Sequence, residues 1–123
     1  MENYNVSITK ASKELTKVER VKFKDTNDCA KLDELTKQGE VIIDVDFYVL
    51  IDVHNEAAKG DKDYQQIVIV DHEGNKYCTG SKTFVNTFLN IADELDGEEY
   101  SVKVIRKPSR NYAGKEFLSC TIA

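Results

Sequence analysis

The sequence predicts a mainly β domain with one or two helices, in which five strands form a small barrel. Three observations support this fold class: a long run of alternating apolar residues, four shorter strand-like runs, and an amphipathic helical segment between the third and fourth strands. The chain has 123 residues, of which 41% are hydrophobic and 32% charged, as is typical of one globular domain with its own core. We expect residues 40–123 to form the barrel and residues 1–39 to form an N-terminal extension.

The first barrel strand is the strongest structural prediction in the chain. Apolar residues occupy every odd position from Val41 to Val53, and a period of two places them on one face of a strand. The opposite face then carries Asp44, Asp46 and Asp52 together with further apolar residues. A typical strand has ~5–6 residues, so we expect one of this length to bend and to serve two parts of a barrel.

The other strands are shorter and are bounded by turn residues. Tyr64–Val70 and Lys76–Thr79 are expected to pair across the turn Asp71–Asn75, where Gly74 can take a positive φ. The remaining strands are expected at Tyr100–Lys107, at Lys115–Ile122 and, in the extension, at Tyr4–Ile8.

Two helices are expected, one in the barrel and one in the extension. Ser81 is a good N-cap for a helix of about four turns that ends near Asp96. Its apolar face consists of Phe84, Val85, Phe88, Leu89, Ala92 and Leu95. Thr16 and Glu19 have the spacing of a capping box, which predicts a shorter helix reaching about Phe23.

The resulting order is strand, strand, strand, helix, strand, strand, preceded by the extension. This is the order of the OB-fold, a small Greek-key barrel that binds oligonucleotides and oligosaccharides. A five-stranded α+β sandwich would give the same order of elements, so the order narrows the topology without proving it.

Charge is distributed unevenly along the chain, whose net charge is -5. Residues 41–100 carry four basic and thirteen acidic side chains, whereas residues 101–123 carry five basic side chains and one acidic. The C-terminal hairpin is therefore a local basic surface on an acidic protein. Single-stranded nucleic acid is held by cations along its phosphates and by rings on which its bases stack.

The candidate binding residues follow from this chemistry. The cations expected to neutralise phosphates are Lys103, Arg106, Lys107, Arg110 and Lys115. The rings expected to stack on bases are Tyr112 and Phe117, with Tyr64 and Tyr77 as further candidates at the starts of two strands. Phe117 should point away from the core, because Leu118 and Cys120 alternate with it.

Other classes of protein and site find little support in the sequence. No apolar run approaches the ~20 residues that cross a bilayer, and no signal peptide follows Met1, so we expect a cytoplasmic protein. Cys29, Cys78 and Cys120 form no C-x-x-C pair, so neither a zinc site nor a disulfide framework is expected. No cofactor motif is present.

Several segments resemble single-stranded DNA-binding proteins of phages and prophages of Gram-positive bacteria. The similar segments are AKLDEL at Ala30–Leu35, GEVIIDVDFYVLIDVHN at Gly39–Asn55, DHEGNKYCTGS at Asp71–Ser81 and VIRKPSRNYAGKEFLSC at Val104–Cys120. The resemblance implies an OB-type fold and sequence-tolerant, non-catalytic binding of single-stranded DNA. It also implies a role inside a bacterial host in phage or mobile-element replication or recombination, with proteins of those processes as partners.

The sequence leaves open two other functions and the association of the chain with copies of itself. The acidic stretch Asp93–Glu99 would suit a phage-encoded inhibitor that mimics DNA and binds a host enzyme. Asp44, Asp46 and Asp52 would suit a metal-dependent nuclease, although alternating acids are ordinary on the polar side of a sheet. An exposed edge strand within residues 1–10 would allow a homo-oligomer to form.

Overall fold

A computed structural model describes residues 4–23, 29–55, 63–95, 98–108 and 116–123. This part of the chain is mainly β, as predicted, with short helices between the strands. The elements are β1 (Tyr4–Ala11), α1 (Lys17–Phe23), β2 (Ala30–Lys31), α2 (Leu32–Leu35), a 3₁₀ helix (Thr36–Gln38), β3 (Val41–Asn55), β4 (Asp63–Asp71), β5 (Lys76–Thr79), α3 (Lys82–Glu94), β6 (Tyr100–Pro108) and β7 (Glu116–Ile122). None of the helices in the described ranges is long and apolar enough to cross a membrane.

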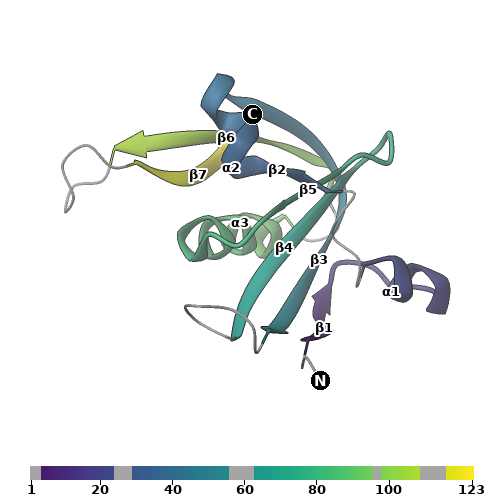
Figure 1. Cartoon of the computed structure of the whole chain (residues 1–123). Helices are drawn as coiled ribbons and strands as arrows, with labels where there is room; N and C mark the ends of the chain where they lie inside the picture. The colour runs from purple at the N-terminus through teal and green to yellow at the C-terminus, as the bar shows by residue number, and fades with distance from the viewer. Residues whose placement is uncertain (1–3, 24–28, 56–62, 96–97, 109–115) are drawn as a thin grey trace.

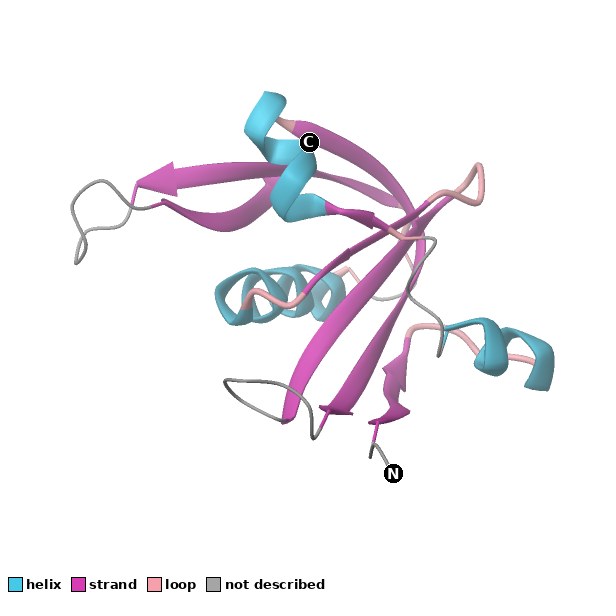
Figure 2. Cartoon of the chain, in the orientation of Figure 1, coloured by secondary structure: helices cyan, strands magenta, loops and turns pink. Residues whose placement is uncertain are grey.

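The strands form one curled, open sheet (Figures 1 and 2). Its order is β2-β5-β4-β3-β6-β7, and β1 pairs with β3 beside this path. All the pairings are antiparallel except that of β2 with β5. Among the described residues no ladder joins β5 to β7, so the predicted closure into a five-stranded barrel is not seen.

A bulge in β3 overturns the prediction that all its odd positions share one face. Val45 pairs with Asp71 but Phe47 pairs with Val70, so Asp46 is an extra residue in the ladder with β4. Because an extra residue reverses the alternation, Ile43 and Val45 face the opposite side of the sheet from Phe47 and the odd residues after it.

From Phe47 to Ile51 both faces of β3 are buried, against different partners. One core lies between the sheet and α3 and includes Tyr48, Leu50, Phe84 and Phe88. The other lies on the opposite face, where apolar side chains of β1, which pairs with β3 within the sheet, and Phe23 of α1 pack with Val49. In Figure 1, α3 lies beneath the β6–β7 hairpin, whereas β1 and α1 lie on the far side of β3.

The two predicted helix starts are confirmed by their caps. The Ser81 hydroxyl accepts a hydrogen bond from the Phe84 amide, and α3 buries the predicted apolar face. At α1, the Thr16 hydroxyl accepts from the Glu19 amide while the Glu19 carboxylate accepts from the Thr16 amide, both at 3.1 Å. This reciprocal pair is the capping box that the sequence predicted.

The short segment from β2 to the 3₁₀ helix was not predicted, and it contacts both β5 and β6. Leu32 is fully buried in the α3-side core, and β2 pairs with β5. The Thr79 hydroxyl of β5 donates to the Asp33 carboxylate at 3.2 Å. The segment thus links β5 to β6, where it is held by Arg106.

The predicted β4–β5 turn is built around the Asp71 carboxylate. It accepts hydrogen bonds from the Glu73 amide at 2.9 Å, from the Asn75 amide at 2.8 Å and from the Asn75 side chain at 3.0 Å. Gly74 has a φ of 88°, which a side chain would disfavour. Partial burial alone would raise the pKa of Asp71, but the hydrogen bonds from Asn75, Glu73 and Tyr77 outweigh it and lower this pKa below 3.8.

We expect Asp71→Asn to flatten the pH dependence of stability in acid. A carboxylate with a lowered pKa in the folded state stabilises the protein above its unfolded-state pKa, and this contribution is lost as the pH falls through the folded-state value. Denaturant unfolding of both proteins between pH ~7 and ~3 measures the effect. Glu73→Gln removes an acid from the same turn and is the control. An identical pH profile for Asp71→Asn and the wild type would contradict this account.

Candidate nucleic-acid interface

The β6–β7 hairpin has an inner face toward the core and an outer face away from it. Val102 and Val104 of β6 are fully buried in the α3-side core, with Leu118 and Cys120 of β7 beside them. Because side chains alternate along a strand, the residues between them face outward. By register, the residues on this outer face are Lys103, Ile105 and Lys107 on β6 and Phe117, Ser119 and Thr121 on β7, of which Ser119 is buried.

Lys107 and Phe117 are direct cross-strand neighbours on this outer face. Such pairs have Cβ atoms about 4.5–5.5 Å apart, so an ammonium group and a ring are presented together. Lys107 is exposed and Phe117 is half-buried. The prediction that Phe117 points away from the core agrees with this register.

Lys103 lies two residues from Ile105 on the same face and is less exposed than Lys107. Its ammonium nitrogen is 3.7 Å from the carboxylate of Glu40, and both side chains are partly open to solvent. An ion pair at this distance and exposure contributes little to stability. Lys103 therefore keeps a charge that an anionic ligand can compete for.

Arg106 lies on the inner side of β6 and is engaged within the protein. Its Nε donates to the Thr36 hydroxyl at 2.9 Å, and its Nη2 donates to the carbonyl of Asp33. The Thr36 hydroxyl in turn donates to the carbonyl of Leu32 at 2.8 Å. Arg106 thus fastens the unpredicted segment to β6, a role that its place in a basic run did not indicate.

We expect Arg106→Ala to lower the free energy of unfolding by about 1–2 kcal/mol, because it removes charge-assisted hydrogen bonds from a partly buried site. The same substitution should weaken the binding of single-stranded DNA less than Lys107→Ala does, since the Arg106 guanidinium already has partners. Urea unfolding and oligonucleotide titration of both variants check the two statements. The opposite ranking of the two affinities would show that Arg106 is a ligand contact.

The other predicted residues lie apart from the described hairpin or outside the described ranges. Arg110, Tyr112 and Lys115 belong to residues that the structure does not describe. Tyr64 packs on the β1-side core, and Tyr77 packs on the α3-side core with its hydroxyl 3.4 Å from Asp71. The structure does not bring these two rings together with Phe117.

The three strand aspartates do not form one cluster. Asp44 accepts from the Ser101 hydroxyl and Asp52 from the Gln65 amide, each at 3.0 Å, while Asp46 lies 3.7 Å from His72. The bulge at Asp46 places Asp44 and Asp52 on opposite faces of β3. Within the described residues no three His, Cys, Asp or Glu side chains gather in a way that could hold a metal ion.

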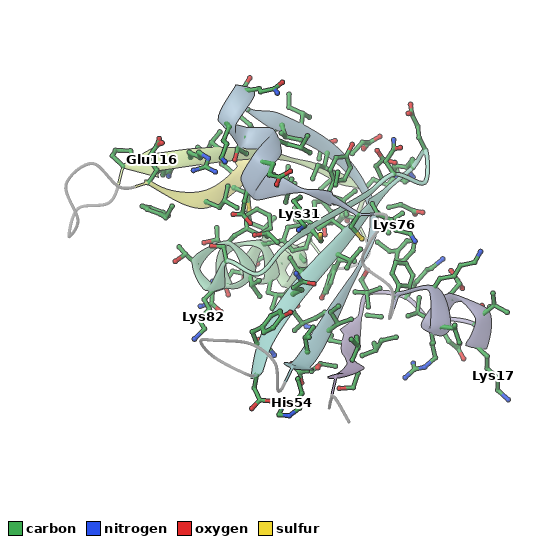
Figure 3. All side chains as sticks on the ribbon, in the orientation of Figure 1. Lys17, Lys31, His54, Lys76, Lys82 and Glu116 are labelled. Atoms are coloured by element: carbon green, nitrogen blue, oxygen red, sulfur yellow. The ribbon has the colours of Figure 1, made fainter. Side chains whose placement is uncertain are left out.

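A cavity of about 840 Å³ lies between the start of α3, the C-terminal end of β3 and the N-terminal end of β4. His54 and Asp63 line it, with 2.5 Å between the imidazole Nδ1 and the carboxylate, and Lys82 and Tyr64 lie at its border. Figure 3 places His54 and Lys82 well away from Glu116 at the start of β7. The cavity is therefore separate from the hairpin surface.

Two outward-facing residues of this region were missed by the sequence prediction. Ile42 pairs with Lys103 and is 58% exposed, and Ile105 follows Lys103 on the same face. Ile42 occupies an even position of β3, so its direction could be derived from the alternation of the sequence. Its neighbours on β6 could not, because they depend on the register between the two strands.

Comparison of the chain with models of protein families, with curated proteins and with solved structures found no match.

Proposed function

We propose that the chain binds single-stranded DNA in a sequence-tolerant way and carries out no catalytic step. One observation carries the proposal: the outer face of β6 and β7 presents Lys107 beside Phe117, with Lys103 further along β6 on the same face. This combination supplies the two interactions that hold a single strand, phosphate neutralisation and base stacking. Arg110, Tyr112 and Lys115, which the sequence also offers for these interactions, lie outside the described residues.

The arrangement of strands favours an OB-type fold for this function. The run β5-β4-β3-β6-β7 within the sheet, with α3 between β5 and β6 in the chain, is compatible with an OB-type order that lacks its closing pair. On β3 and β4 the face opposite α3 is buried by side chains of β1 and α1. A strand of DNA would then have the hairpin face available rather than this covered one.

The resemblance of the sequence to phage and prophage proteins suggests the setting. We place the protein in the cytoplasm of a bacterial host, where replication or recombination of phage or mobile-element DNA exposes single strands. Proteins of these processes would be its partners.

A titration with labelled oligo-dT of about 15 nucleotides at about 50 and 200 mM salt tests the proposal. We expect binding that weakens with salt, with a log–log slope of about -0.7 for each phosphate contact. A duplex of the same length should bind more weakly, because its bases cannot stack on Phe117. A folded protein that does not bind oligo-dT at the lower salt would rule the proposal out.

A second candidate function is supported by an acidic cavity of about 480 Å³ between β1, β3 and the end of α3. Asp46, Asp93, Glu98 and Glu99 line it, and Asp93 makes an ion pair with Lys10 at 3.0 Å. Such a surface suits a protein that mimics DNA and binds a basic site on a host enzyme. Recovery of one host protein in a nuclease-treated pull-down, together with no affinity for oligo-dT, would favour this function.

A further inference from the structure

The outer face of the hairpin continues onto β3 as a diagonal apolar stripe. Ile42 lies opposite Lys103, and Phe117 lies opposite Lys107. Ile105 stands on β6 midway between these two lysines, so Ile42, Ile105 and Phe117 form a line across the three strands. Diagonal neighbours in an antiparallel sheet are about 7–8 Å apart, which spaces the three apolar side chains evenly.

Two lysines flank the stripe, and a hollow lies beside it. Lys103 and Lys107 lie on either side of Ile105 along β6. β3 begins only at Val41, after the chain turns at Gly39 with a φ of 136°, so Ile105 has no described partner on that side. A hollow of about 600 Å³ lies there, bordered by Ile105, Arg106 and the turn that contains Lys37 and Glu40.

We propose that this stripe holds three successive bases of one DNA strand, at Phe117, at Ile105 and at Ile42. The inference rests on the proposed function and extends it from a basic hairpin to a site that spans three bases. Phe117 stacks on the first base, the hollow beside Ile105 receives the second, and Ile42 packs against the third. Lys107 and Lys103 neutralise the phosphates between them.

Charges of both signs surround the stripe. Lys103 and Lys107 are its central cations, and Lys37 adds a third at the hollow. Glu40 and Glu116 also line the hollow, Glu40 pairs with Lys103, and Asp44 lies near Ile42. A base-bearing strand satisfies both the central cations and the evenly spaced apolar side chains, whereas a purely apolar partner would supply no anion to Lys107.

A length series of oligo-dT, from two to about eight nucleotides, tests the stripe with three variants. Phe117→Ala should weaken binding about tenfold at every length. Ile42→Ala should weaken binding about threefold, and only for oligonucleotides of three or more nucleotides, because shorter ones do not span the stripe. Ile122→Ala is the matched control, since Ile122 is an isoleucine 49% exposed on the other face of β7.

The outcomes separate this inference from the proposed function. An Ile42→Ala variant that binds every length as the wild type does, while the wild type binds well, overturns the stripe but leaves DNA binding intact. A wild-type protein that binds no oligo-dT overturns both. Circular dichroism and urea unfolding of each variant show whether a loss of affinity reflects lost contacts or lost folding.

Discussion

Replacing Lys103 and Lys107 together with alanine should weaken the binding of single-stranded DNA about a hundredfold at low salt. Each lysine is expected to make one charge-assisted phosphate contact, and the loss of such a contact costs about 1.5 kcal/mol or roughly tenfold in affinity. The salt dependence should change too, with a slope shallower by about 1.4 for two lost contacts. Titration of labelled oligo-dT at several salt concentrations measures both quantities.

A double variant on another surface separates this effect from a general loss of charge. Lys17 lies on the exposed side of α1 and Lys31 on β2, and Figure 3 places Lys17 at the opposite end of the molecule from Glu116 and the hairpin. Lys17→Ala with Lys31→Ala changes the net charge by the same amount. Equal losses of affinity in the two double variants would mean that binding follows net charge rather than the hairpin surface.

Phe88→Ala should lower the free energy of unfolding by about 3–5 kcal/mol, the largest loss of stability that we expect from a single substitution. Phe88 is fully buried where α3 meets the curled sheet. Its ring packs edge-on against Tyr48, with 5.4 Å between centroids, and stacks with Phe84 at 6.0 Å. Truncation leaves a cavity that neighbours on two different elements cannot easily fill.

Urea or guanidinium unfolding measures this loss, and Val21→Ala is the control. Val21 is a large apolar residue that α1 leaves exposed, so its truncation should change stability by no more than about 0.5 kcal/mol. A Phe88→Ala variant that is nearly as stable as the wild type would mean that the contacts of Phe88 do not stabilise the α3-side core as described.

The elements with long, regular patterns could be predicted from the sequence. The alternation from Val41 onward gave β3, and helical spacing after Ser81 gave α3 with its buried face. Both helix starts followed from hydrogen-bonding residues at fixed spacing, since a cap depends on neighbours in the chain.

The features that depend on distant partners could not be predicted in this way. An extra residue at Asp46 leaves the apolar pattern of β3 unchanged but reverses its faces. The segment of β2, α2 and the 3₁₀ helix is too short to show a period. Its attachment to Arg106 joins residues about seventy positions apart. Charge density alone grouped Arg106 with Lys107, whereas the pleat of β6 places them on opposite faces.

In the candidate site, too, features set by local patterns could be predicted, and features set by distant partners could not. The basic hairpin and the outward direction of Phe117 were derived from local alternation. The contribution of Ile42 depends on the register between β3 and β6, which no local pattern contains.

Mapping of chemical shifts on the isotope-labelled protein, titrated with oligo-dT of about 10 nucleotides, tests the central claim most directly. We expect the largest changes at the methyl groups of Ile42 and Ile105, at the ring of Phe117, and at the amides of Lys103 and Lys107. Changes that instead centre on Tyr64 or on the cavity around His54, with none on the outer face of β6 and β7, would contradict the account.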